Sequence, residues 1–378
     1  MRLELDRFAR TAILAALGST ATLATAEDDT APLTLDHYVR HASTVPAIRG
    51  ETVQLYVRER VLAGTLARTA DFTGRVALFV HGAGTPAEVA FDVPYEGYSW
   101  MGYLAEAGYD VFSMDVTGYG RSTRPNVMND PCNVTPEQRA VLGVDCEPSY
   151  PRDLGNIAAD WDDIAAVVDY VRTLRSVEEL ALLGWSLGGP RAGGFAAQNP
   201  EKVSKLVLLA PAYDRERSPD PPAELPADGV AMTVQSHADF TANWERQLGC
   251  ATQLDPGAAA SVWAEMLASD PVGATWGPGV RRAPRTTVWT FSRAMAARIR
   301  TPTLIVQGIH DAQVVPERAQ SFYADLGAPQ KVYVDLGCAS HNAMWERNRE
   351  LLFRASLQWL RDGTVDGSDN GVLQMGYE

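Results

Sequence analysis

The stretch LALLGWSLGG at residues 180–189 decides the fold. Its centre, GWSLG at 184–188, fits the pattern G-x-S-x-G, with an apolar run before it and a helical, glycine-containing pattern after it. Such a pattern predicts a serine on a sharp turn between a strand and a helix, where glycines permit close packing and the helix N-terminus favours negative charge. By chance the five-residue pattern occurs in about one chain in ten, and a glycine-rich packing turn is the alternative. The flanking strand and helix favour Ser186 as a nucleophile.

A serine nucleophile needs a histidine base and a carboxylate that orients the base. His341 closes GCASH at 337–341, after the predicted strand 331–335, and Asp311 closes GIHD at 308–311, after the predicted strand 303–307. Because parallel strands present their carboxyl ends at one edge of a sheet, we expect Ser186, Asp311 and His341 to meet at that edge. Their order along the chain is the one expected for a G-x-S-x-G hydrolase.

Other acids and histidines compete for these roles. Asp214 and Glu216 follow the predicted strand 206–210, but Asp311 is favoured over both. His310 is expected to point away from Asp311 in extended chain, and His81 to be a structural ring under its loop. The other three histidines have no placed partner, and we assign them no role.

The acyl-transfer intermediate carries an oxyanion that needs two N–H donors. One is expected from Leu187, the residue after the nucleophile. The second is expected from the loop HGAG at 81–84, which follows the predicted strand 75–80, and we assign it to the Ala83 amide.

Short β-branched runs alternate with helical patterns along the chain, which predicts a mainly parallel sheet covered on both faces, an α/β fold. Besides the strands named above, we predict 52–61 as an edge strand, together with 110–115 and 180–185. Predicted helices are 100–107, 160–175, 188–199, 317–324 and 347–361.

Two segments break this alternation. Residues 123–153 are rich in Pro, Asn and Asp and are predicted to form a long loop. Residues 213–300 are too long for a connection between two strands and are predicted to be an inserted cap with helices near 238–248 and 258–267. The predicted domains are 1–26 as a signal peptide, 27–212 with 301–378 as the core, and 213–300 as the cap.

Composition is that of a globular chain, with 46% hydrophobic and 21% charged residues and a net charge of −14 over 378 residues. The negative charge disfavours a nucleic acid partner. The N-terminus has arginines, an apolar run at 11–23 and Ala-Thr-Ala at 24–26, so we expect a signal peptide and a periplasmic or extracellular protein; a cytosolic N-terminal helix is the alternative. No later run reaches the about 18 apolar residues of a membrane span.

Four cysteines follow the N-terminal segment: Cys132, Cys146, Cys250 and Cys338. In an oxidising compartment an even number indicates two disulfides, with three possible pairings. We favour Cys132 with Cys146 because they flank one polar loop, which leaves Cys250 with Cys338. Four free thiols are the alternative, and no cysteine spacing indicates a metal site.

The ordered segments HGAG (81–84), DVTGYGRS (115–122), GWSLGG (184–189), GIHDAQVVP (308–316) and GCASH (337–341) resemble those of the α/β-hydrolase superfamily, over residues 51–361. The resemblance implies a mostly parallel eight-stranded sheet with helices on both faces, a Ser–His–Asp triad, no metal and no cofactor. A helical cap inserted after the sixth strand is also typical of the superfamily. Relatives that are dehalogenases or epoxide hydrolases carry aspartate where this chain has Ser186.

A serine at this turn suits acyl transfer, and we expect a secreted hydrolase of small carboxylic esters. The alternatives are an aminopeptidase or amidase, for which Glu245 or Glu265 in the cap would hold the amine, a lactonase, and a non-catalytic ligand-binding protein. Aromatic residues near the oxyanion loop, the nucleophile and the cap predict an apolar or aromatic portion in the substrate. The candidate substrate-binding residues are Tyr98, Trp100, Trp185, Trp244 and Trp289. The oligomeric state is not predicted.

Overall fold

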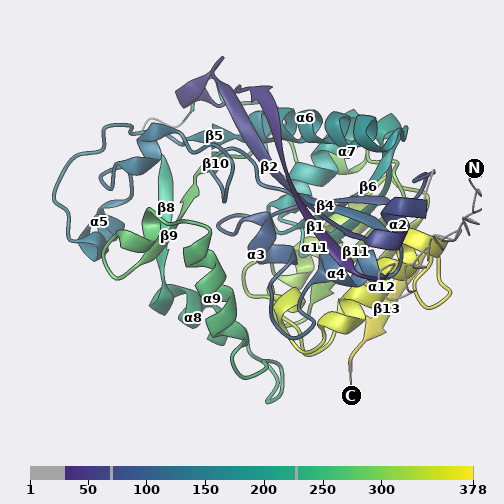
Figure 1. Cartoon of the computed structure of the whole chain (residues 1–378). Helices are drawn as coiled ribbons and strands as arrows, with labels where there is room; N and C mark the ends of the chain where they lie inside the picture. Colours follow the sequence, from purple (N-terminus) through teal and green to yellow (C-terminus); the bar gives the residue numbers. More distant parts are fainter. Residues whose placement is uncertain (1–29, 69–70, 226–228, 378) are drawn as a thin grey trace, which may run out of the picture.

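A nine-stranded sheet runs through the computed structural model, which describes residues 30–68, 71–225 and 229–377 (Figure 1). The strand order is β1-β2-β4-β3-β6-β7-β11-β12-β13. β2 pairs antiparallel with β1 and with β4, and the other pairs in the sheet are parallel. The strands are β1 (Pro32–Ala42), β2 (Thr52–Leu62), β3 (Val76–Val80), β4 (Asp110–Met114), β6 (Leu180–Trp185), β7 (Val203–Leu209), β11 (Thr303–Gly308), β12 (Lys331–Leu336) and β13 (Gly371–Met375).

Both faces of the sheet are buried, and each forms its own hydrophobic core. In β3, Leu78 and Val80 belong to the core under α6 (Ile157–Arg175) and α7 (Gly194–Gln198). Ala77 and Phe79 belong to the core under α4 (Trp100–Glu106) and α12 (Arg349–Asp362). This alternation follows from the two-residue period of a strand. The helices outside residues 213–300 are α2 (Ala63–Arg68), α3 (Ala87–Phe91), α4 (Trp100–Glu106), α5 (Pro136–Leu142), α6 (Ile157–Arg175), α7 (Gly194–Gln198), α11 (Pro316–Asp325) and α12 (Arg349–Asp362). The short helix α10 (Arg293–Ala296) lies near the end of that range.

The α/β architecture with a mostly parallel sheet is confirmed, and the sheet has one strand more than the eight that the resemblance implied. The additional strand is β13, which lies parallel to β12 with Val332 opposite Gly371. β1 was not predicted either, because its polar sequence leaves most of its side chains exposed or half-buried beside β2.

Between β7 and β11 the chain forms the cap, which we define as residues 213–300. It contains an antiparallel hairpin of β8 (Met232–Ser236) and β9 (Val280–Pro284), with α8 (His237–Glu245) and α9 (Ala258–Ala268) between them. The helices agree with the sequence prediction, whereas the hairpin was not predicted. α8 begins with a capping box, in which Ser236 accepts from the Asp239 amide and the Asp239 carboxylate accepts from the Ser236 amide.

Residues 123–153, predicted as a long loop, contain the short helix α5 and lie beside the β8–β9 hairpin (Figure 1). The Gln138 side chain donates to Val234 O at 2.8 Å, and the Asn133 carbonyl accepts from the Met232 amide at 3.3 Å. Just after this segment, β5 (Gly155–Asn156) pairs in parallel with β10 (Thr286–Thr287) of residues 213–300, which is a second contact between the cap and this part of the chain. Residues 123–153, which were predicted to belong to the core, therefore pack against the cap.

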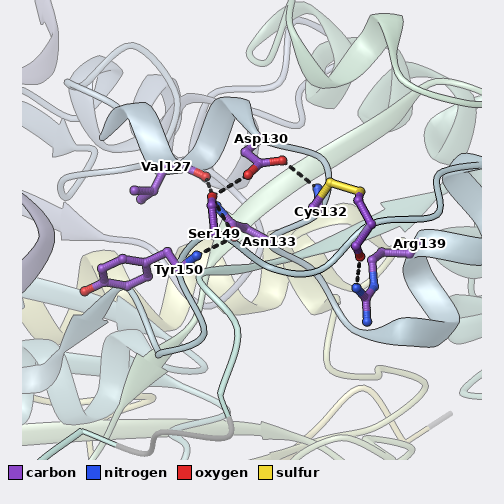
Figure 2. Close-up of a disulfide and its surroundings, with 8 residues drawn as sticks. Val127, Asp130, Cys132, Asn133, Arg139, Ser149 and Tyr150 are labelled. Carbon is purple, nitrogen blue, oxygen red and sulfur yellow. Dashed lines mark hydrogen bonds between the residues drawn. A yellow bond between two sulfur atoms is a disulfide. The ribbon is translucent and has the colours of Figure 1, made fainter.

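Cys132 and Cys146 lie at disulfide-bonding distance in this segment, with 5.7 Å between their α-carbons (Figure 2). Asp130 accepts from the Cys132 amide, and Asn133 accepts from the Tyr150 amide. The pairing favoured from sequence is thus the one present, and a polar network holds both ends of the loop.

The predicted signal peptide, residues 1–26, lies outside the described residues. Within the part of the chain that the structure describes, no helix is long and apolar enough to cross a membrane.

Candidate active site

Ser186 lies on the turn between β6 and the helical segment that begins at Gly188, as the sequence predicted. Its φ is +57°, an uncommon conformation for a non-glycine residue, and its amide donates to Leu209 O at 3.0 Å. A β-carbon on Gly188 would lie 2.3 Å from Val80 O, and one on Gly184 would lie 2.4 Å from Gly188 O. Both glycines are therefore needed for strand and helix to approach this closely around the serine.

His341 and Asp311 are joined by a buried hydrogen bond, with 2.8 Å between Nδ1 and Oδ2. They come from the loops after β12 and β11, at the edge of the sheet where β6 delivers Ser186. Since Nδ1 donates to the carboxylate, Nε2 of a neutral His341 carries the lone pair. Ser186 and His341 line the same cavity, so the three residues predicted from sequence are brought to one place.

The Asp311 carboxylate is fixed by further donors. Its Oδ1 accepts from the amides of Gln313 and Val314, each at 2.8 Å, and its Oδ2 accepts from the Gln307 side chain at 3.1 Å. Gln307 lies on β11 and was not predicted as part of the site. Because every contact of the carboxylate is directional, its orientation toward His341 is determined.

The loop after β3 lies directly against the nucleophile. A β-carbon on Gly82 would come within 2.9 Å of the Ser186 Cβ, so only glycine fits there. Ala83 lines the cavity. Among the described residues, the amides of Ala83 and Leu187 have no acceptor, which leaves both available to an oxyanion.

His81 supports this loop, as the sequence analysis expected. It is fully buried, accepts from the Val116 amide through Nε2 at 3.2 Å, and contacts Gly82 O through Nδ1 at 2.7 Å. Burial, followed by the nearby Arg191, holds the pKa of His81 well below its ordinary value. The imidazole of His81 is therefore neutral and supports the loop 81–84 from below.

The loop that carries His341 is anchored to the cap. Cys338 lies at disulfide-bonding distance from Cys250 of the cap, with 5.6 Å between α-carbons. The Glu346 carboxylate accepts from the Ser340 amide at 2.7 Å and from the Trp244 indole of α8 at 2.8 Å. Burial raises the pKa of Glu346, against the opposing effect of these hydrogen bonds. The loop that carries His341 is thus held by the cap as well as by the sheet.

A cavity of about 90 Å³ lies between the cap and the sheet edge. This is small beside the roughly 300–1,000 Å³ of drug-sized sites. Its lining is made of residues from the sheet edge and from the cap: Ala83, Thr85, Trp185, Ser186, Gln235, Phe240, Asn243, Met266, Arg281, Gln313, His341, Asn342 and Trp345.

Of the five aromatic residues predicted to bind substrate, only Trp185 lines this cavity, and its indole donates to His341 O at 2.8 Å. Contrary to the prediction, Tyr98 donates to Asp255 behind the site, Trp100 stacks on Phe353 in the core, and Trp244 bonds Glu346. Trp289 lines a separate surface hollow. Sequence indicated aromatic content correctly but could not indicate which way each ring points.

The competing acids and cap carboxylates lie elsewhere. Asp214 is exposed and is within 3.9 Å of Arg217, and Glu216 and Glu245 are exposed. His310 contacts Cys250 at 3.7 Å rather than the cavity. No Asp or Glu is among the cavity-lining residues of the described chain.

Arg281 was missed by the sequence analysis, as were the amides Gln235, Asn243 and Gln313 that line the cavity with it. The alternation of apolar and polar residues in MTVQS at 232–236 is the signal that could have revealed β8, and its partner strand carries the arginine. Within the described residues there is no group of three or more His, Cys, Asp or Glu side chains that could hold a metal ion.

A family model described as alpha/beta hydrolase fold matches residues 77–348, and the chain belongs to this family. Among curated relatives, a pimeloyl-[acyl-carrier protein] methyl ester esterase of Vibrio campbellii is 35% identical over 108 residues, 27% of this chain and 39% of the relative. An enzyme of the same description from Chromobacterium violaceum is 29% identical over 163 residues, 42% of this chain and 62% of the relative. The matches thus span less than two thirds of either relative.

Solved structures share the fold at low identity. A thermophilic esterase from Thermogutta terrifontis has a TM-score of 0.50 and 17% identity, and the match covers 86% of this chain and 98% of that one. A serine hydrolase from Cycloclasticus zankles, a bacterium that degrades polyaromatic hydrocarbons, has a TM-score of 0.51 and 13% identity, with 87% and 99% covered.

Proposed function

We propose that the protein is a serine hydrolase that cleaves small carboxylic esters through an acyl-enzyme on Ser186. The observation that carries the proposal is the buried hydrogen bond of His341 to Asp311, together with the cavity that His341 shares with Ser186. The esterase descriptions of the partial relatives and the family membership support the same class.

The first half of the reaction acylates the serine. Nε2 of His341 takes the Ser186 proton, and Oγ attacks the ester carbonyl. The Ala83 and Leu187 amides donate to the oxyanion, and Asp311 stabilises the imidazolium. When the tetrahedral intermediate collapses, His341 gives its proton to the leaving alcohol.

The second half releases the acid. Water replaces the alcohol, His341 removes its proton, and the hydroxide formed attacks the acyl-enzyme carbonyl. The same two amides hold the second oxyanion. Collapse expels Ser186, which recovers its proton from His341, so the enzyme returns to its starting state.

We also propose that the protein is exported after removal of residues 1–26 and that its core is formed by residues 27–212 and 301–378. The two cysteine pairs at bonding distance support an oxidising compartment, where disulfides persist.

An aminopeptidase is less well supported, because a free amine needs an acceptor and no carboxylate lines the cavity in the described chain. Glu245, considered from sequence, is exposed. A lactonase would use the same nucleophile, base and oxyanion donors, so only the preferred substrate distinguishes a lactonase from an esterase.

The test is hydrolysis of p-nitrophenyl acetate and butyrate by the mature protein and by Ser186→Ala. The variant is expected to lose activity by about 10³-fold or more, since the nucleophile is gone. Ser321→Ala, on α11 and not among the residues that line the cavity, is the matched control and is expected to keep full activity. Equal rates for Ser186→Ala and wild type would refute the acyl-enzyme, and faster release from proline p-nitroanilide than from the esters would favour the aminopeptidase.

A further inference from the structure

Arg281 places a guanidinium inside the Ser186 cavity. It lies on β9 opposite Gln235 of β8, and both residues line the cavity. A β-carbon on Gly84 would come within 2.3 Å of the Arg281 Nη1, so the guanidinium rests on the same loop that carries Ala83. Gly84 has a φ of +82°, which glycine adopts without strain.

Among the residues that the structure describes, this guanidinium has a single hydrogen-bond partner. Its Nε donates to the Gln235 side chain at 2.9 Å, whereas Nη1 is buried with no partner among the described residues. Within those residues no carboxylate forms an ion pair with Arg281. Burial lowers the pKa of Arg281 to about 10, and Tyr119 and Asp270 oppose this only in part.

The neighbouring arginines are placed differently. Arg282, the next residue, pairs with Asp270 at 2.7 Å, and Arg124 lies 3.8 Å from the same carboxylate. The Asp270 carboxylate therefore already interacts with two arginines and does not form an ion pair with Arg281. In a chain of net charge −14, this region holds three buried or half-buried arginines around one aspartate.

An unpaired cation under a cap is unfavourable unless a ligand supplies the anion. Resting on the function proposed above, we infer that Arg281 is a specificity residue that binds a carboxylate of the substrate, so that the preferred substrates are small esters bearing a free carboxylate near the scissile bond. A carboxylate suits the guanidinium because both are planar and two N–H groups match two oxygens. The cavity of about 90 Å³ must also hold the ester, which favours this compact anion.

The carboxylate can belong to either side of the ester, so the test uses two pairs of probes. Methyl hydrogen succinate and methyl succinamate differ only in carboxylate against carboxamide on the acyl side. O-acetyl glycolate and O-acetyl glycolamide differ in the same way on the alcohol side. In at least one pair, wild type is expected to have kcat/KM at least about tenfold higher for the carboxylate, mainly through KM.

Arg281→Gln is expected to bring that ratio near one, and Arg281→Lys to keep part of it because the charge remains. The matched control is Arg285→Gln, which removes an exposed arginine just beyond β9 and should leave the ratio unchanged. If wild type treats both members of both pairs alike, the inference is wrong, whether or not the variants fold.

A binding measurement separates this inference from the proposed function. Calorimetry on Ser186→Ala with the same probes is expected to give at least about tenfold tighter binding of a carboxylate member, and loss of this preference when Arg281→Gln is added. Ester turnover without carboxylate preference in either assay would overturn the inference and leave the hydrolase. Selective binding without any turnover would overturn the hydrolase and leave Arg281 as a carboxylate-binding residue.

Discussion

At the scale of single residues, Asp311 is the most constrained group of the site. Its Oδ1 accepts two backbone amides, so only Oδ2 is presented to His341 Nδ1 and Gln307 Nε2. The two oxygens are therefore not interchangeable, which makes the effect of an isosteric substitution predictable.

Asp311→Asn is expected to lower kcat by about 10³- to 10⁴-fold with little change in KM. The asparagine oxygen must stay on the two backbone amides, which turns its NH₂ group toward His341 Nδ1. The ring must then accept at Nδ1 and carry its proton on Nε2, the tautomer that cannot take the Ser186 proton. Steady-state kinetics with an ester probe measure the loss.

Asp214→Asn is the control for this prediction, because Asp214 is the competing acid and is exposed. It should retain wild-type kcat. Loss of activity in Asp214→Asn with retention in Asp311→Asn would reverse the assignment of the acid.

The sequence predicted that Ser186, Asp311 and His341 come together because each follows a strand, and strand ends are fixed by the sheet. It could not predict Gln307, which is a buried strand residue with nothing in its spacing to mark it. Nor could it place Tyr98 and Trp100, since an aromatic residue signals burial but not the cavity that it faces.

At the scale of elements, the cap contacts the loop that carries His341 through several groups. These include the Cys250–Cys338 pair and the Trp244 indole on Glu346. A change in the position of α8 is therefore transmitted through Trp244 and Glu346 to Ser340, the residue before His341.

Replacing both Cys250 and Cys338 by alanine is expected to lower the free energy of unfolding by about 4.6 kcal/mol, since the bond closes a long loop of the unfolded chain. The sequence separation is 88 residues. We also expect kcat to fall by about tenfold or more, because the His341 loop loses an anchor. Denaturant unfolding and ester kinetics measure the two effects.

The matched control is the Cys132→Ala/Cys146→Ala variant, whose cysteines are separated by 14 residues and lie away from His341. Its stability should fall by about 3 kcal/mol with kcat within about twofold of wild type. If both double variants affect kcat equally, the link from cap to histidine has no catalytic role.

The parallel strands of the sheet from β3 to β12 were predicted from the sequence, whereas β13 and the β8–β9 hairpin were not. The sheet strands are continuous apolar runs such as LALLGW in β6, whereas VRRAP in β9 contains two adjacent arginines. Arginine is a poor signal of a buried strand, because its burial depends on partners elsewhere in the chain such as Asp270 and Gln235. The residue that carries the substrate inference was therefore the hardest to predict.

At the scale of the whole molecule, several carboxyl groups are buried with incomplete pairing. Burial raises the pKa of Asp163 to about 7, and neighbouring Asp160 and Asp162 add to this, while the Thr117 hydrogen bonds oppose it. Its Oδ2 accepts from the Thr117 amide at 2.8 Å, and its Oδ1 lies 3.6 Å from His41 Nε2.

The folded-state pKa of Asp163 lies above the 3.8 of the unfolded chain, so the folded state holds more protons between about pH 4 and 7. Its contribution to stability therefore falls as pH rises through this window, by up to about 4 kcal/mol. Asp163→Asn keeps an acceptor for Thr117 and has no proton to lose. It is expected to be more stable relative to wild type at pH 8 than at pH 5, as measured by urea unfolding.

Asp145→Asn, which changes an exposed carboxyl group, is the control and should show no such dependence. An equal stability difference between Asp163→Asn and wild type at both pH values would contradict the prediction.

The Cys250–Cys338 pair also sets an order of synthesis. A ribosome makes Cys250 88 residues before Cys338, whereas Cys146 follows Cys132 after only 14. The loop beside the cap can thus be closed while most of the chain has yet to be made. Cys250 has no native partner until β12 and the loop beyond it exist, so the bond beside His341 is the last of the two to become possible. The second cysteine pair, which links the cap to the His341 loop, can therefore form only when the chain is nearly finished.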